Sequence, residues 1–146
     1  MRDSALNDHK KGESVEKVTK VVEELRINDV SVSGTYMLGH LSDTLDSIKE
    51  DLEELNRLFL YCIVFLVFTP YPELPIYKVW EESGTIINKN WRDYDGMTLV
   101  FNHPHMSPEE VKEAFRYAVT NVCNPYNYNK RRILKKLDIL KTNMKK

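Results

Sequence analysis

The longest run of apolar residues lies near the middle of the chain, at residues 58–68. Many of its members are β-branched or aromatic, which favours a strand that is apolar on both faces. A membrane helix is the alternative, but it needs about 20 apolar residues, and the sequence TPYP at residues 69–72 ends the run sooner. We therefore predict a buried parallel strand, with Cys62 as a small core residue within it.

The first third of the chain alternates between helical and strand patterns. Ser14 is a suitable N-cap for a helix whose apolar residues recur at spacings of three and four. Residues 30–38 follow as a short strand, and a second helix begins at Asp43, with Asp43 and Thr44 expected to cap it. The order helix, strand, helix, strand predicts a parallel βαβ unit. Because two parallel strands leave open edges, we expect such a sheet to be completed by further strands.

The second half of the chain is mainly helical, with an irregular middle. Residues 76–83 predict a short helix, and residues 97–101 a brief strand. Ser107, followed by a proline and then by Glu110, forms a capping box for a longer helix that we expect to stop near Pro125. We predict a basic helix from Lys130 onward. It would be either a surface that binds membranes or nucleic acid, or a docking helix with a solvated cationic face.

Composition excludes several classes of function. The chain has 146 residues, which suits one domain, and 21 basic against 22 acidic residues leave a net charge of -1. No global field therefore attracts nucleic acid or an anionic membrane, and we expect no transmembrane segment. Two cysteines do not make a Cys-rich metal cluster or a disulfide framework. The first residues lack the apolar stretch of a signal peptide, so we expect a cytoplasmic protein.

A few polar and aromatic residues allow alternative interpretations. His103 and His105 are conceivable metal ligands together with Asp93 or Asp95, but a polar loop is the favoured interpretation, and we predict no metal site. Cys123 would be reactive only if it is exposed beside the basic end of the chain.

The aromatic residues Trp91 and Tyr94 have two interpretations. Both would line a substrate cavity in a longer relative, or they would pack an extension onto the rest of the fold. The residues alone leave these alternatives open.

Three stretches together resemble the radical S-adenosylmethionine (radical SAM) enzymes. SGTYMLGHLSDTLDSIKEDLEEL, from residue 33, resembles a late strand and helix of their barrel, and VFTPYPELPIYKVWEESGTI, from residue 67, resembles the last strand and its turn. NWRDYDGMTLVFNHPHMSPEEVKEAF, from residue 90, is similar to the C-terminal extension of the subgroup that carries a cobalamin-binding domain. The resemblance extends from residue 15 to about residue 137.

The resemblance implies a fold and its cofactors. The fold is α/β: residues 14–75 would be the last αβαβ portion of a partial TIM-type (β/α)6 barrel, residues 76–146 a mainly helical C-terminal extension with a basic terminal helix, and residues 1–13 a polar tail. Members of the family use S-adenosylmethionine and a [4Fe-4S] cluster, with cobalamin in the subgroup. The sequence contains no Cys-x3-Cys-x2-Cys motif for the cluster, so we expect the chain alone to bind no cofactor.

The resemblance also implies candidate residues for the S-adenosylmethionine side of a barrel. These residues are Met37 and Gly39 at the end of the first strand, and Thr69 and Pro70 after the second. Both loops depart from the family pattern, because HLS at residues 40–42 replaces the usual Phe-x-x or Phe-Pro-Gly, and Glu73-Leu74 replaces the Gly-Thr of the last turn. A position that needs positive φ would be more strained at Glu73 than at glycine.

Three functional hypotheses follow. The first and favoured one is a fragment or truncated homologue of a radical SAM enzyme without activity of its own. The second is a subunit that completes a split barrel with a chain carrying the N-terminal barrel half, and the third is a small binding protein that acts through the basic C-terminal helix. We also expect the isolated chain to be weakly stable or aggregation-prone, because the edge of its first strand has no partner.

Overall fold

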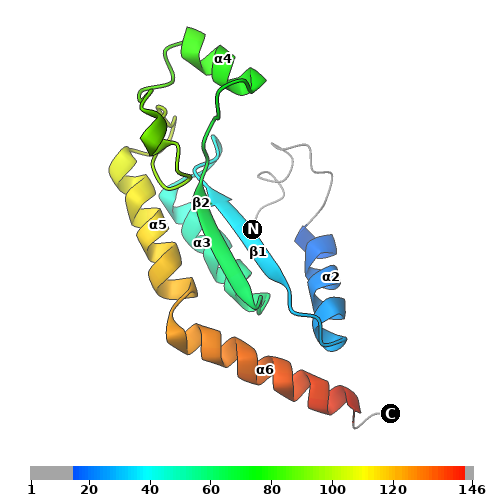
Figure 1. Cartoon of the computed structure of the whole chain (residues 1–146). Helices are drawn as coiled ribbons and strands as arrows, with labels where there is room; N and C mark the ends of the chain where they lie inside the picture. Colours follow the sequence, from blue (N-terminus) through cyan, green and yellow to red (C-terminus); the bar gives the residue numbers. More distant parts are fainter. Residues whose placement is uncertain (1–14, 144–146) are drawn as a thin grey trace.

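The computed structural model describes residues 15–143, which form an α/β structure (Figure 1). The elements follow in the order α2 (Val15–Ile27), β1 (Ser33–Leu38), α3 (Leu45–Arg57), β2 (Cys62–Val67), α4 (Pro75–Glu82), the 3-10 helix η1 (Trp91–Asp93), α5 (Pro108–Val122) and α6 (Pro125–Asn143). This order confirms the predicted αβαβ arrangement. The predicted polar tail at residues 1–13 and the Ser14 cap lie outside the described residues.

The sheet consists of β1 and β2, which pair in parallel. The register places Ser33 opposite Cys62 and Leu38 opposite Val67. β1 begins three residues later than predicted, because the Val30 N–H still donates to Leu25 O at 2.9 Å and so belongs to the end of α2. Within the part of the chain that the structure describes, β1 has β2 on one side and no strand on the other.

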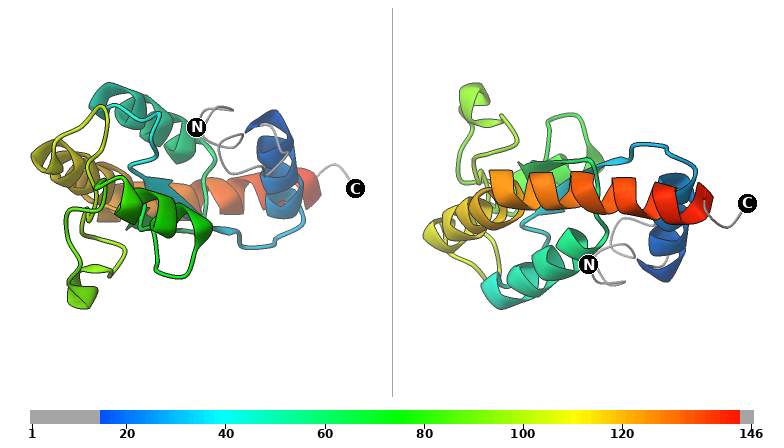
Figure 2. Two further views of the ribbon diagram at one scale, coloured as in Figure 1. Left: turned by 90° about the horizontal axis from the view of Figure 1, so that it is seen from above. Right: turned by 90° about the horizontal axis from the view of Figure 1, so that it is seen from below.

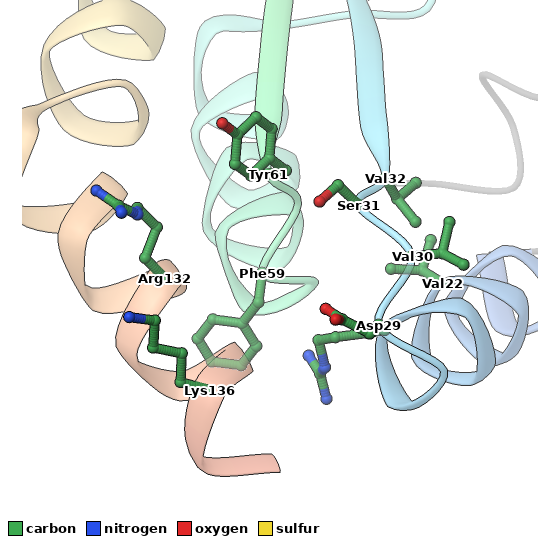
Figure 3. A pocket seen from close by; sticks show the side chains of 10 residues that line it. Val22, Asp29, Val30, Ser31, Val32, Phe59, Tyr61, Arg132 and Lys136 are labelled. Atoms are coloured by element: carbon green, nitrogen blue, oxygen red, sulfur yellow. The ribbon is translucent and has the colours of Figure 1, made fainter. Parts of the chain in front are cut away.

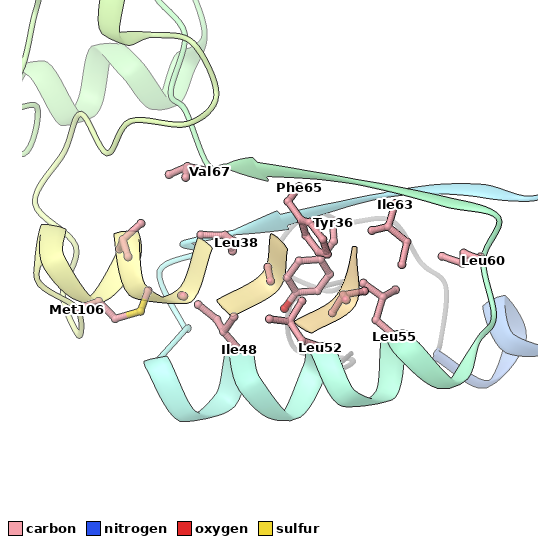
Figure 4. Close-up of a cluster of buried hydrophobic side chains, with 14 of the residues drawn as sticks. Tyr36, Leu38, Ile48, Leu52, Leu55, Leu60, Ile63, Phe65, Val67 and Met106 are labelled. Carbon is pink, nitrogen blue, oxygen red and sulfur yellow. The ribbon is translucent and has the colours of Figure 1, made fainter. Parts of the chain in front are cut away.

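One face of this sheet is packed by α3 and α5 (Figure 4). Side chains of both strands point toward α3, where the Tyr36 hydroxyl donates to the buried Asp51 carboxylate at 3.0 Å. The buried residues of the sheet, of α3 and of the chain just before β2 are Tyr36, Leu38, Ile48, Leu52, Leu55, Leu60, Ile63, Phe65 and Val67, and those of α5 are Val111, Ala114, Ala118 and Val122. This is the main core of the structure.

The other face of the sheet, which we call the open face, is largely uncovered by the described residues; only Leu66 at its end is partly covered, where Gly96 lies close to it. Met37 is 36% exposed and Val64 48% exposed, and Thr35 and Cys62 on the same face are also exposed. The prediction that the second strand is buried on both faces is therefore wrong in this chain, and Cys62 is not a core residue. The apolar run contains residues for two covered faces, but the described helices cover only one.

A second, smaller core lies beyond the ends of the strands, around α4 and the loop that follows it. Its buried residues are Tyr77, Trp80, Ile86, Tyr94, Val100 and Phe101. Phe68 packs partly against this second core, and Leu99 packs against both cores. The predicted brief strand at residues 97–101 is reduced to a single antiparallel bridge between Ile86 and Phe101.

The last two helices follow one another closely. The Ser107 hydroxyl accepts the Glu110 N–H, and the Glu110 carboxylate accepts the Ser107 N–H at 2.7 Å, which confirms the capping box of α5. α5 ends at Val122, close to Pro125 as predicted, but α6 begins at Pro125 itself and not at Lys130. Proline suits the first turn of a helix, because its missing N–H would have no partner there.

Helix α6 crosses below the sheet and lies against α2 (Figure 2). Two of its apolar side chains, Ile133 and Leu137, are 58% and 45% exposed, so they do not dock α6 onto the core. Within residues 15–143, no helix combines the length and apolar character that crossing a membrane requires.

Candidate functional site at the strand ends

The parallel strands bring the candidate residues from two loops to one edge of the sheet. Gly39 follows β1, and Thr69 and Pro70 follow β2, at the ends that point toward α4 in Figure 1. The Phe68 N–H donates to Leu38 O at 2.8 Å, so the two chains are still paired where they leave the sheet. Parallel pairing of β1 and β2 therefore places these residues side by side.

The four candidate residues differ in exposure. Met37 lies on the open face and presents its side chain there. Gly39, Thr69 and Pro70 are buried, and the Thr69 hydroxyl donates to Val67 O at 3.0 Å. Of the four, Met37 therefore offers an exposed side chain, while the other three shape the backbone at the strand ends.

Gly39 is required here by its backbone conformation. Its φ is +86°, in the region that side chains rarely adopt. A Cβ at this position would lie 3.8 Å from Val67 Cγ1 and 3.9 Å from the Phe68 nitrogen, which are ordinary contacts. Glycine is therefore needed at this position for the positive φ of the turn. Space for a Cβ is available, so close packing is not the reason.

Asp43 orders the loop after β1. One of its carboxylate oxygens accepts the N–H groups of Gly39 and His40, each at 2.9 Å, and the residue is 1% exposed. Of the two residues expected to cap α3, Thr44 is the N-cap and forms a capping box with Ser47, whereas Asp43 is not a cap. Aspartate often bonds backbone N–H groups near it in loops, but the sequence alone did not separate this role from capping.

His103 joins the loop before α5 to the loop after β1. Its Nδ1 accepts the N–H groups of His105 and Met106 at 3.1 Å, so its Nε2 carries the hydrogen and donates to His40 O at 2.6 Å. Both ring nitrogens are therefore occupied by hydrogen bonds that hold the two loops together.

The aspartates that were considered as metal ligands with His103 have local partners instead. Asp93 accepts the side-chain amides of Asn88 and Asn90, and Asp95 accepts the N–H groups of Met97 and Thr98. Among the described residues, no group of three or more His, Cys, Asp or Glu side chains is arranged to hold a metal ion.

An aromatic cluster covers the strand ends. The ring of Phe68 lies 5.5 Å from that of His40, 5.9 Å from Trp80 and 5.9 Å from Phe101, and Trp80 and Phe101 are 4.7 Å apart between centroids. These contacts join the loops after both strands to α4 and to the segment before α5. The end of the sheet is thus closed by packed rings from four segments.

Tyr94 is buried in this packing, whereas Trp91 only borders it, with its ring centroid 5.5 Å from that of Tyr94. Tyr94 is 8% exposed and donates its hydroxyl to Asn88 O at 2.8 Å, and burial, together with Tyr77, raises its pKa to about 12. Trp91 is 66% exposed. Of the two interpretations of these residues, packing of the extension therefore applies to Tyr94.

Glu73 has the backbone conformation that the sequence comparison indicated. Its φ is +70° in the turn that precedes α4, and its side chain points into solvent with Lys78 at 4.0 Å. A non-glycine residue pays a conformational penalty here.

The two cysteines lie in different surroundings. Both are exposed, Cys62 on the open face and Cys123 at the end of α5, where its thiol donates to Ile63 O at 3.6 Å. The condition for a reactive Cys123, namely exposure, is met.

A cavity that the sequence did not indicate lies at the opposite end of the sheet, between α2, α6 and the segments that enter the strands (Figure 3). It encloses about 280 Å³. Two of its residues, Asp29 and Phe59, have positive φ. Aspartate adopts this conformation comparatively easily, whereas Phe59 carries no sequence signal for it.

Comparisons with known proteins give two relatives at low identity, and no family model matches the chain. The chain is 27% identical, over 110 residues, to bacteriochlorophyllide d C-8(2)-methyltransferase of Chlorobaculum tepidum. The aligned region makes up 74% of this chain and 24% of the relative. It is also 21% identical, over 85 residues, to an uncharacterized methyltransferase of Pyrococcus horikoshii, and this alignment makes up 58% of this chain and 18% of the relative. The chain thus matches about a quarter or less of the length of two methyltransferases.

Proposed function

We propose that this chain is the last portion of a radical SAM barrel of a methyltransferase, and that it has no catalytic activity alone. The resemblance of its three stretches to that family and its similarity to two methyltransferases support this proposal. The residues present do not fit the iron-sulfur cluster, because Cys62 and Cys123 are fewer thiols than its ligation needs and lie on different elements. The cluster would therefore be held by other residues.

The observation that carries the proposal is the open face of the sheet. In a parallel barrel the helices lie outside, and alternate strand residues fill the interior. Here α3 and α5 cover the face of Tyr36 and Phe65, while Met37 and Val64 on the opposite face are exposed. The open face then corresponds to the inner wall, and the unpaired side of β1 to the place where the preceding barrel strand would pair.

The strand ends would form part of the S-adenosylmethionine side of this barrel. Ligand sites in parallel barrels are built at the C-terminal ends of the strands, where Gly39, Thr69 and Pro70 lie together. We assign Met37 to a side-chain contact and Gly39 to a backbone contact with the cofactor. Asp43 would fix the Gly39–His40 backbone through its two hydrogen bonds, and the aromatic cluster would close the rim.

A chimera tests this proposal without depending on the affinity of separate parts. The region of the Chlorobaculum methyltransferase that matches this chain is replaced by the chain itself, and the enzyme lacking that region is the reference. We expect the chimera to recover solubility and binding of S-adenosylmethionine, measured by anaerobic equilibrium dialysis after cluster reconstitution. In the chimera, Cys62 should resist N-ethylmaleimide, whereas in the isolated chain it should react, as peptide mass spectrometry would quantify.

A matched pair of substitutions makes the test specific for the open face. Val64→Asp should abolish the recovery, because it places a charge on the inner wall. Val79→Asp, at a position in α4 that is 61% exposed, should leave it intact. Three results together would refute the proposal. The isolated chain would be a folded monomer, the chimera would be no more soluble than the enzyme lacking the region, and Cys62 would react equally in the isolated chain and in the chimera.

The binding-protein hypothesis is the second candidate, and one observation favours it. Ile133 and Leu137 are exposed on α6 beside cationic residues such as Arg132 and Lys136. Such a surface suits a polyanion, and its binding would fall steeply with salt. Fluorescence anisotropy with a labelled single-stranded DNA, titrated with salt, would support this candidate if the affinity falls at least tenfold between low and physiological salt.

A further inference from the structure

The cavity at the entry to the strands is built by residues from both ends of the chain. Val22 and Arg26 come from α2, Phe59 and Tyr61 from the segment before β2, and the segment from Asp29 to Val32 precedes β1. Helix α6 supplies Arg132 and Lys136, on the opposite side in Figure 3. Its volume of about 280 Å³ is near the lower end for ligand pockets, about 300 Å³.

One side of the cavity is apolar and rigid. The side chains of Val22, Val30 and Val32 cluster on the α2 side in Figure 3, with the ring of Phe59 across from them. Val22 is 6% exposed and belongs to the main core, which anchors this wall. Such a wall suits a flat apolar group.

The charges at the cavity favour an anion. Arg26, Arg132 and Lys136 contribute three cations, and Asp29 contributes one carboxylate. The Arg26 guanidinium lies over the Phe59 ring at 5.3 Å, and that of Arg132 lies over Tyr128 at 5.6 Å. Stacking on Tyr128 orients the Arg132 guanidinium, and the planar fork of its N–H groups suits an anionic partner.

The backbone at this cavity is strained. Asp29 has φ 61° and Phe59 has φ 53°, and Glu73 is the other non-glycine residue with positive φ in the part of the chain that the structure describes. Positive φ is a genuine outlier for a bulky residue such as phenylalanine. Both residues stand two positions after the end of a helix, Asp29 after α2 and Phe59 after α3, where a left-handed conformation commonly ends the helix. These two helix ends place the Phe59 ring under the Arg26 guanidinium at the cavity.

We propose that this cavity binds a small anion with a flat apolar body, in which a carboxylate, sulfonate or phosphate pairs with Arg132 and Lys136 while the apolar part lies against Phe59 and the valines. The site is at the opposite end of the strands from the S-adenosylmethionine side proposed above, and it does not depend on that proposal. Because α6 carries the cations and α2 the apolar wall, the ligand would join the two ends of the chain.

Two fluorescent probes separate the anionic group from the apolar body. Anilinonaphthalene sulfonate carries a sulfonate, and N-phenyl-1-naphthylamine has the same rings without charge. We expect saturable binding of the sulfonate at one site per chain, at least about tenfold tighter than binding of the neutral probe, since one charge-assisted hydrogen bond corresponds to about that ratio.

Three glutamine variants of α6 locate the binding. Arg132→Gln and Lys136→Gln should each weaken sulfonate binding about fivefold to tenfold and leave the neutral probe nearly unchanged. Lys130→Gln removes the same charge from the same helix but lies outside the cavity, so it is the matched control. Asp29→Asn should act in the opposite direction and strengthen sulfonate binding.

Several results would overturn the proposal. Equal affinities for the two probes would remove the role of the cations, and an equal effect of Lys130→Gln would reduce that role to general electrostatics. Loss of the signal in Val64→Ser, with no change in Arg132→Gln, would place the probe on the open face instead. Circular dichroism of each variant checks that α6, whose substituted side chains are exposed, remains folded.

Discussion

Replacing Asp43 by alanine should strongly destabilise the chain, because the buried carboxylate orders the loop after β1. The carboxylate is buried and accepts two backbone N–H groups, from Gly39 and His40, both at 2.9 Å. A hydrogen bond to a charged group contributes about 1.5–3 kcal/mol, and the His40 bond is only partly buried, so its share lies at the lower end. We therefore expect Asp43→Ala to lower the free energy of unfolding by about 3–5 kcal/mol.

Urea denaturation followed by tryptophan fluorescence measures this loss. Asp43→Asn keeps an acceptor oxygen without the charge and should lose only about 1–2 kcal/mol. Asp46→Ala is the matched control, since this exposed aspartate lies in the first turn of α3 and contributes about 0.3–1 kcal/mol through the helix dipole. If Asp43→Ala and Asp46→Ala lie within about 1 kcal/mol of each other, the two hydrogen bonds do not hold the loop as described.

Three further predictions concern strain and titration. Glu73→Gly should stabilise the chain by about 0.5 kcal/mol, because the relief of positive φ, about 1–2 kcal/mol, exceeds the entropy cost of glycine; Glu73→Ala should give no gain, and equal melting temperatures of the two variants would contradict this. Hydrogen bonds from Ser107 lower the pKa of Glu110, so its stabilising contribution is present above its ordinary value of 4.5 and is lost as the pH falls through the lower folded value; thermal melts at acidic pH should show a weaker dependence in Ser107→Ala than in the parent. Burial raises the pKa of Tyr94 to about 12, so its contribution is lost as the pH rises from 10 toward 12, and Tyr94→Phe should remove that part of the alkaline unfolding in a pH titration.

The sequence predicted those elements whose ends are marked by local chemistry. Ser107 and Glu110 fix the start of α5 through bonds within one turn, so the pattern sufficed. Pro125 correctly marked the end of α5, but the start of α6 was predicted too late, at Lys130. Proline ends one helix and also suits the first turn of the next, and the pattern was used only for the first of these roles.

The strand faces and the site were predictable only in part. The apolar run identified β2, but the exposure of Val64 and Cys62 depends on which helices pack against the sheet, and that is a tertiary property. The neighbourhood of Gly39 and Thr69 followed from parallel pairing. The role of Asp43 and the backbone conformation of Phe59 could not be predicted. Each depends on tertiary partners that the local sequence does not identify.

The division of the interior into two cores, joined through Leu99, has a consequence for cooperativity. The smaller core around Trp80 and Phe101 rests on rings and short loops, whereas the larger one is supported by a sheet and two helices. The segment that contains the smaller core can then open as a separate unit at a lower free energy than global unfolding. Amide hydrogens such as that of Asn102, which donates to Thr85 O at 2.8 Å, would exchange with deuterium well before those of β2, and the strand ends beneath would be uncovered while the sheet stays intact.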